Sequence, residues 1–287
     1  MCRLAAFPPG TTPETAHLIV SEMERGNDHG VGTVYLQDKT FVINKFPISY
    51  KEAVVQKKPL FDHMPHKGWT LAHVRFRTHG EQVYQNTHPI IRGDIAVVHN
   101  GVFNTSLMVR AALGKSVKWQ GETDSEVGAY ILDQVGPEEF YRVVPSGNGV
   151  WLALNRDGSL TGVKLSGDLE FFRNEDDTLI LASEFPWKGG FKKSSKYFTL
   201  GHIKMAPDGH PLSFKLEKKE SYTPMTSCGP YTRQDCSTMN DMRRQAHQPI
   251  LTNSSKGSGV VLPHQDPIEL WNWPDDDRMA EYLRGLA

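Results

Sequence analysis

Two short apolar runs constrain the fold of this chain most, because each reads as a buried strand that leads directly into polar side chains. The first, WTLAHVRFRTHG, covers residues 69–80, and the second, DIAVVHNGVF, covers residues 94–103. In the second run the Asn100-Gly101 dipeptide breaks the strand, because Asn and Gly tolerate the positive φ angles of turns. We therefore expect core strands whose ends present polar groups on one edge.

Helices are expected on either side of these strands. In residues 11–25, TTPETAHLIVSEMER, Thr12 is placed as an N-cap, Pro13 falls at the first helical position, and apolar residues recur at helical spacing. A second helix is expected over residues 122–136, beginning near Thr123 or Asp124. Its predicted apolar face consists of Val127, Tyr130, Ile131 and Val135.

The remaining patterned segments are β-rich. Residues 26–46 hold two such runs joined by Asp38-Lys39, which predicts a hairpin. From residue 141 to about 205, short strands are expected to alternate with turns such as NRDGS and RNEDD.

The composition changes around residue 206. Residues 206–260 are polar, rich in Ser, Thr and Gly, and without sustained periodicity, which is typical of a linker or a loosely structured tail. Residues 261–287 carry two of the six tryptophans beside a helix-like stretch at 275–286. That short segment either packs back on its own domain or is a docking helix for a partner. We thus predict a domain over residues 1–205 and two further parts with the boundaries just given.

Composition excludes several classes of function. The chain has 287 residues, a formal net charge of −1 and no apolar run of membrane-spanning length, so neither a nucleic-acid nor a membrane partner is expected. No secretory signal is apparent, so the expected location is cytoplasmic. The three cysteines, Cys2, Cys228 and Cys236, give no disulfide framework. Neither they nor HMPH at 63–66 have metal-ligand spacing, so no metal and no cofactor is expected.

Cys2 raises a chemical question, because removal of Met1 would give it a free α-amino group beside its thiol. That amine has a reference pKa of roughly 7.7–8.0, just below the value of about 8.5 for a thiol, so it suits a general base. A thiolate that attacks a carboxamide creates an oxyanion, which Asn100 and the Gly101 N–H could stabilise. An amino-acid substrate would need an arginine and a carboxylate, which Arg75 and Asp124 supply.

Each of these residues also has a structural interpretation. His73 and His99 could be core histidines, Asp124 a helix N-cap, and Arg75 a member of a surface ion pair. Taken in combination, however, the motifs resemble the class II glutamine amidotransferase domain, an N-terminal-nucleophile hydrolase, over about residues 1–205. The segments that carry the resemblance are MCR at 1–3, RGNDHGVG at 25–32, HVRFRTHG at 73–80, NTHP at 86–89, HNG at 99–101, GETDSEV at 121–127 and LASE at 181–184.

The resemblance implies a fold and a reaction. The fold is of the α+β class, a four-layer αββα sandwich of two mainly antiparallel sheets, followed here by the loosely structured C-terminal tail. The β-rich runs described above fit it. The reaction is hydrolysis of the γ-carboxamide of glutamine through a Cys2 thioester, which releases ammonia for a separate synthetase or transferase. Cys2 would be the nucleophile and its freed amine the base, with Asn100 and Gly101 as the oxyanion hole.

The same resemblance assigns the substrate contacts. Arg75 would hold the α-carboxylate of glutamine and Asp124 its α-amino group, while Phe76 would form an apolar wall. Thr78, His79 and His88 fall on motif positions that line the pocket.

Two positions depart from the family pattern and keep alternatives open. Phe76 replaces a tryptophan, and Arg77 stands where a small residue is usual. If strand alternation continues, Arg77 shares a face with Arg75. Arg77 then either turns to solvent at the strand end or selects a more anionic substrate. The alternatives to an ammonia donor are a stand-alone hydrolase of another γ-glutamyl amide and a catalytically silent binding module.

Overall fold

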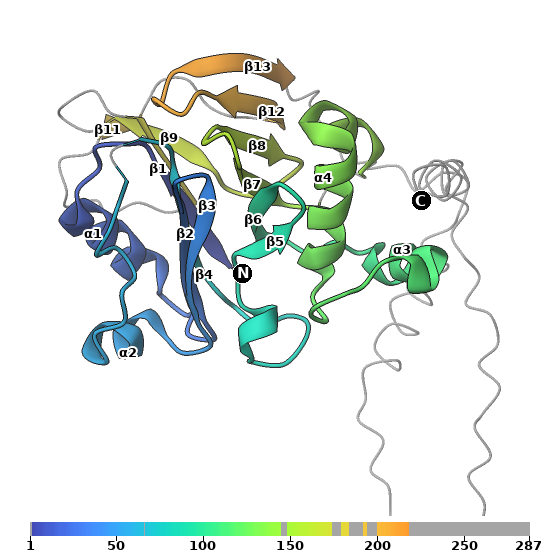
Figure 1. Cartoon of the computed structure of the whole chain (residues 1–287), viewed down its shortest axis with the longest axis horizontal. Helices are drawn as coiled ribbons and strands as arrows, with labels where there is room; N and C mark the ends of the chain where they lie inside the picture. Colours follow the sequence, from blue (N-terminus) through green and yellow to red (C-terminus); the bar gives the residue numbers. More distant parts are fainter. Residues whose placement is uncertain are drawn as a thin grey trace, which may run out of the picture. The chain divides into compact units, whose positions relative to one another are not determined.

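In the computed structural model, residues 2–65, 67–144, 148–173, 179–183, 192–193 and 200–217 are described. Within this part, the strands form two sheets, here called sheet A and sheet B, and helices lie on the outer face of each (Figure 1). Every strand pair in these residues is antiparallel. The predicted α+β sandwich of antiparallel sheets, with the layer order αββα, is therefore confirmed.

Sheet A holds the N-terminal strand at an interior position, paired on both edges. Its strands, in order across the sheet, are β11 (Lys192–Lys193), β9 (Glu170–Arg173), β10 (Leu179–Ala182), β1 (Arg3–Phe7), β4 (Thr70–Val74), β2 (Val31–Gln37) and β3 (Thr40–Phe46). The predicted hairpin is β2–β3, where Asp38 and Lys39 have φ angles of 49° and 62°. Two positive φ angles give the turn a twist that matches the flanking strands.

Sheet B holds the strand that ends in Asn100. Its strands, in order, are β13 (Pro211–Glu217), β12 (Leu200–Met205), β8 (Leu160–Lys164), β7 (Val150–Asn155), β6 (Ile95–Asn100) and β5 (Ile90–Arg92). Because β13 pairs with β12, the boundary expected after residue 205 falls inside a hairpin of sheet B. The sequence of β13, PLSFKLE, alternates apolar and polar residues as strands do, but the long polar stretch that follows it led to the prediction of a linker here.

Helices α1 (Pro13–Met23) and α2 (Tyr50–Val55) cover sheet A, and α3 (Ser106–Leu113) and α4 (Asp124–Val143) cover sheet B. Two short 3₁₀ helices, η1 (Tyr84–Asn86) and η2 (Gly114–Ser116), lie in connecting segments. The predicted cap of α1 is confirmed, because the side chain of Thr12 accepts a hydrogen bond from the Thr15 N–H.

Helix α4 extends beyond its predicted end. Gly136 has a φ of 74°, which interrupts the regular helix, and Pro137 begins a second helical stretch that runs to Val143. Proline suits the first turn of a helix because it has no N–H to leave unpaired. Residues 141–143, expected to begin the strand-rich region, are therefore helical.

Strand alternation sorts the core into layers. Leu4 and Ala6 of β1 pack between the sheets, whereas Ala5 and Phe7 pack against the helices on sheet A. In β4, Leu71 faces the space between the sheets, and in β6 the residues Ala96 and Val98 do the same. Since side chains alternate along a strand, the inter-sheet face continues to Cys2, to His73 and Arg75, and to Asn100.

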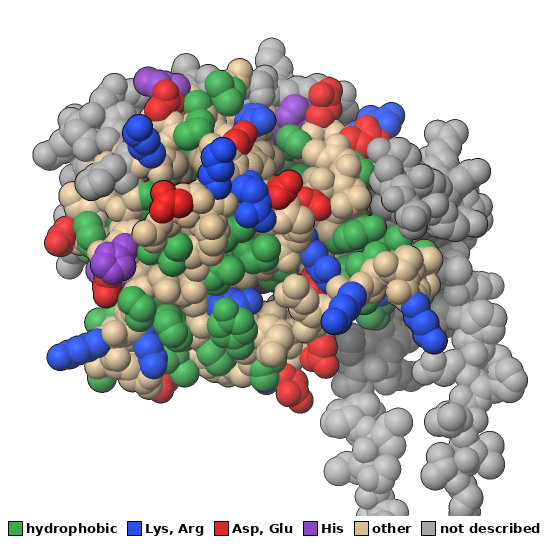
Figure 2. Space-filling model, viewed as in Figure 1, with side chains coloured by type: hydrophobic (Ala, Val, Ile, Leu, Met, Phe, Trp, Pro, Cys, Tyr) green, Lys and Arg blue, Asp and Glu red, His purple; other side chains and the backbone are tan. Residues whose placement is uncertain are grey.

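The surface carries no single dominant charge on the face drawn in Figure 2. Acidic and basic side chains are interspersed there with apolar ones. This agrees with the formal net charge of −1 for the whole chain. Among the described residues, no helix is long and apolar enough to cross a membrane.

Candidate active site

Cys2 lies at the start of β1, against the backbone of Phe76. Its Sγ accepts a hydrogen bond from the Phe76 N–H and donates one to the Phe76 carbonyl, both at 3.3 Å. Although the side chain is partly exposed, burial raises the pKa of the Cys2 thiol, and the Phe76 hydrogen bond and the charge of Arg75 offset only part of this rise. A thiol with a raised pKa is protonated at rest, so it needs a base when it attacks a substrate.

Arg75 is a buried cation next to this thiol, with only 2% of its surface exposed. Its guanidinium donates hydrogen bonds to the carbonyls of His79 at 2.7 Å, Gly80 at 3.4 Å and Glu81 at 2.9 Å. These bonds use at most three of its five N–H donors, so others can meet an anion. Burial lowers the pKa of Arg75, and the nearby Cys2 opposes that change.

Asn100 ends β6, and the chain turns there through a very close contact between two glycines. A β-carbon on Gly101 would lie 2.7 Å from the Cα of Gly149, and one on Gly149 would overlap the carbonyl of Asn100. Asn100 itself is buried, and its Nδ2 donates to the Oγ of Ser183 at 3.4 Å. Glycine at both positions therefore lets this corner, the predicted oxyanion hole, close tightly.

Replacing Gly149 by alanine tests that packing. We expect a loss in the free energy of unfolding of about 3 kcal/mol, from the positive φ of 81° and the overlap with the Asn100 carbonyl together. Gly158→Ala is the matched control, because Gly158 has a φ of 86° but its β-carbon would meet nothing nearer than 3.4 Å. The control should lose only about 1–2 kcal/mol in urea denaturation. Equal losses would show that the glycine contact is not tight.

Asp124 is the first residue of α4 and is almost fully buried. Its Oδ2 accepts a hydrogen bond of 2.6 Å from the N–H of Phe103, just beyond the Asn100-Gly101 corner. Its negative charge raises the pKa of Cys2 and also that of Arg75, which places it within electrostatic reach of both. The side chain therefore joins the start of α4 to the end of β6.

A buried histidine, His99, connects the same two elements. Its Nε2 lies 3.0 Å from the carbonyl of Asn148, which can only accept, so Nε2 carries the proton. Burial lowers the pKa of His99, so the ring is neutral and its Nδ1 accepts from the hydroxyl of Ser125 at 2.9 Å. The Trp151 ring stacks on the His99 ring, with the ring centroids 3.6 Å apart. The ring thus fixes the position of Ser125, the neighbour of Asp124.

His73 connects the two sheets at the level of the site. Its Nε2 donates to the carbonyl of His99 at 3.0 Å, and burial lowers its pKa to about 3. The His88 ring packs against the His73 ring with centroids 4.1 Å apart and the planes tilted by 34°, and burial takes the pKa of His88 well below the usual 6.5. A neutral His73 therefore ties the strand that leads to Arg75 to the strand that leads to Asn100.

The other predicted residues lie on the segment after β4. Phe76 is 39% exposed and packs edge-on against His29 at 5.5 Å, while Thr78 and His79 have exposed side chains. Because β4 ends at Val74, the alternation stops and Arg77 is exposed rather than buried beside Arg75. The N–H of Arg77 donates to the Nδ1 of His29 at 3.1 Å.

Sequence reasoning missed several residues that hold this site. Ser183 accepts hydrogen bonds from both the Asn100 side chain and the Leu4 N–H, so it joins the strand that follows Cys2 to the Asn100-Gly101 corner. Ser183 lies in the LASE motif at 181–184, one of the segments that carry the family resemblance, but the resemblance assigns this motif no role. His29, Ser125 and Glu126 also lie in quoted motifs without an assigned part, and their roles depend on contacts between distant segments.

A cavity of about 740 Å³ lies at the other end of β1 and is unrelated to these residues. It is lined by Gly10, Thr11 and Thr12 at one side and by residues such as Tyr35 and His63 at the other. Within the described residues, no three His, Cys, Asp or Glu side chains are grouped so as to hold a metal ion. Met1, His66, Cys228, Cys236 and the predicted docking segment lie outside the described residues.

Comparisons with known proteins connect this geometry to a family. No family model matches the chain. A glutamine–fructose-6-phosphate aminotransferase from Pectobacterium atrosepticum is 34% identical over 117 residues, which are 37% of this chain and 19% of that protein. Its counterpart from Zymomonas mobilis is 43% identical over 65 residues, 22% of this chain and 11% of that protein. The matched segments thus span a small part of these longer relatives.

A solved structure supports the fold over a longer range. The glutamine phosphoribosylpyrophosphate amidotransferase of B. subtilis superposes with a TM-score of 0.59 at 15% identity, covering 76% of this chain and 50% of that one. At this identity the likeness concerns the architecture alone. Shared sequence over part of the chain and shared architecture together confirm the resemblance: the two-sheet domain of this chain is similar to class II glutamine amidotransferase domains and has the N-terminal-nucleophile hydrolase fold.

Proposed function

We propose that this domain hydrolyses the side-chain amide of glutamine, with Cys2 as nucleophile and glutamate and ammonia as products. The observation that carries the proposal is the grouping of four side chains: Arg75 and Asp124 lie within electrostatic reach of the Cys2 thiol, and Ser183 bonds both Asn100 and the N–H of Leu4 on the strand that follows Cys2. Arg75 would bind the α-carboxylate of glutamine and Asp124 its α-ammonium. The γ-carboxamide would then lie toward Cys2.

The first half of the reaction forms a thioester. The Cys2 sulfur attacks the amide carbon while its proton passes to the α-amino group that removal of Met1 would expose. The negative charge moves to the carbonyl oxygen, where the Asn100 side-chain amide and the Gly101 N–H would donate hydrogen bonds. The C–N bond then breaks, and the protonated amine returns its proton to the leaving nitrogen, which departs as ammonia.

The second half regenerates the thiol. Water attacks the γ-glutamyl thioester while the same amine accepts a proton from the water. The C–S bond then breaks, the protonated amine returns that proton to the Cys2 sulfur, and glutamate is released. The raised pKa of the Cys2 thiol fits this scheme, because such a thiol needs a base in each cycle. Phe76, Thr78 and His79 are proposed as contacts around the substrate, and His88 as support behind His73.

An acceptor for the ammonia is the other part of the proposal. The curated relatives are named as aminotransferases that use glutamine, and the matched segments make up 19% and 11% of them. By analogy, we propose that ammonia from this domain serves a synthetase or transferase partner. That partner would be a separate protein.

The first experiment is an intact mass, taken before and after exposure to a glutamine analogue that alkylates the catalytic thiol. We expect a species that lacks Met1, takes up one label, and is protected from labelling by glutamine. A species that retains Met1 would favour a silent binding module, because Cys2 would then lack a free amine. If another γ-glutamyl amide prevents labelling and glutamine does not, the stand-alone hydrolase is favoured. The exposed Arg77 would then contact the substituent on the amide.

A further inference from the structure

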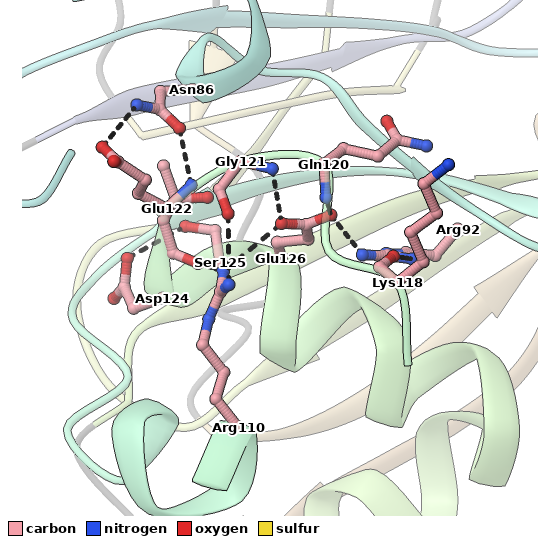
Figure 3. A network of polar contacts seen from close by, with 11 residues as sticks. Asn86, Arg92, Arg110, Lys118, Gln120, Gly121, Glu122, Asp124, Ser125 and Glu126 are labelled. Carbon is pink, nitrogen blue, oxygen red and sulfur yellow. Dashed lines mark hydrogen bonds and ion pairs between the residues drawn. The ribbon is translucent and has the colours of Figure 1, made fainter. Parts of the chain in front are cut away.

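The segment that leads into α4 and includes Asp124, the first residue of that helix, is here called the 118–124 loop. One buried carboxylate, that of Glu126, holds it. This side chain is 2% exposed and receives the N–H of Gln120 at 2.7 Å and that of Gly121 at 2.9 Å. It also pairs with the guanidiniums of Arg92 and Arg110 (Figure 3). One carboxylate therefore binds two backbone amides and two cations.

This arrangement departs from the sequence pattern around it. Thr123-x-x-Glu126 matches a capping box, in which the glutamate would bond the N-cap N–H. Here the Glu126 carboxylate instead reaches the loop before the helix, and the Thr123 hydroxyl has no partner among the described residues. The carboxylate thus secures the loop rather than the helix end.

The two arginines secure the same loop from different elements. Arg92, from β5, donates to the carbonyl of Lys118 at 3.0 Å. Arg110, from α3, donates to the carbonyls of Gly121 at 3.1 Å and Thr123 at 2.9 Å. Their guanidinium carbons lie 5.0 Å and 4.6 Å from the centroid of the Trp119 ring. Loss of the Glu126 charge would leave two partly buried cations without their shared partner.

We propose that Glu126 is a positioning residue that keeps the carboxylate of Asp124 where an amino-acid substrate presents its α-ammonium group. Asp124 is two residues away on the first turn of α4, and its Oδ2 holds the Phe103 N–H at 2.6 Å. Movement of the 118–124 loop would shift that carboxylate and release the Phe103 amide. The inference rests on the proposed function only in the identity of the group that Asp124 receives.

The first test is a substrate comparison with Glu126→Gln. The two substrates are glutamine and 4-carbamoylbutanoate, which is the same molecule without the α-amino group. We expect the kcat/KM preference of the full chain for glutamine to fall by about tenfold or more in the variant, as when one charge-assisted hydrogen bond is lost. Most of the change should be in KM. An equal loss for both substrates would overturn the proposal.

The second test does not depend on catalysis. Amide hydrogen exchange of the full chain should be about tenfold faster in Glu126→Gln at Gln120 and Gly121, whose N–H groups bond Glu126, and at Phe103, whose N–H bonds Asp124. Glu138→Gln, an exposed charge on the same helix, should leave all three unchanged.

The exchange result separates the two proposals. Unchanged exchange at Phe103 in Glu126→Gln would overturn the positioning role, even if Gln120 and Gly121 exchange faster. If the wild-type protein does not hydrolyse glutamine, but exchange at all three amides is faster in Glu126→Gln, only the proposed function is overturned. The positioning of Asp124 would then stand for whichever cationic group it binds.

Discussion

Replacement of Cys2 by alanine is expected to lower kcat for glutamine hydrolysis by a factor on the order of 10⁴ or more. Losing a covalent nucleophile has an effect of this size because binding and the oxyanion donors alone accelerate the reaction much less. In the proposed reaction Cys2 forms the covalent intermediate, and its thiol lies within electrostatic reach of Arg75, so its loss should have the largest effect. Steady-state release of ammonia measures the effect.

We expect Cys2→Ala to fold as the wild type does. The hydrogen bonds of Cys2 go to the backbone of Phe76 at 3.3 Å, and alanine fits in the same space. Thermal unfolding of Cys2→Ala should therefore stay close to that of the wild type. Cys228→Ala, which removes another of the three cysteines, is the control for thiol loss in general. Activity of Cys2→Ala within tenfold of wild type would rule out Cys2 as the nucleophile.

Acid should destabilise this domain well above the pH at which most carboxylates titrate. In the fold, burial lowers the pKa of His73 to about 3 and takes that of His88 well below 6.5. Below pH 6.5 the unfolded chain binds protons at these residues that the folded chain does not, so stability falls as pH falls. At pH 5 the loss is roughly 2 kcal/mol for each histidine, or about 4 kcal/mol together, relative to pH 8.

A variant of His88 isolates one part of this loss. Neither ring nitrogen of His88 has a hydrogen-bond partner among the described residues, so phenylalanine can keep the ring contact with His73 without losing a hydrogen bond. In urea denaturation, His88→Phe should reduce the loss between pH 8 and pH 5 by roughly 2 kcal/mol. His210→Gln, at an exposed position, should leave it unchanged. An unchanged loss in His88→Phe would mean that His88 already binds a proton in the fold.

Local patterns predicted the elements that depend on neighbours in the chain. The Thr12 cap and the Asp38-Lys39 turn follow from preferences of φ, ψ and side-chain hydrogen bonding over a few residues. The face shared by His73 and Arg75 follows from the two-residue period of a strand. Errors arose where a short strand was followed by a long polar stretch, as in β13, or where a helix continued after an interruption at Gly136.

The sequence by itself also determined which residues are candidates for the chemistry of the site, because Cys2, Arg75, Asn100 and Asp124 could be named from their types and order. What only the tertiary structure decided is how they are held. Arg77 leaves the strand face because the β4 ladder ends at Val74, and Ser183 reaches Leu4 across 179 positions of the chain. The carboxylate of Glu126 bonds the 118–124 loop and not the N-cap N–H of α4, because arginines from two other elements pair with it there. Such contacts join segments that are far apart in the chain, and no local pattern encodes them.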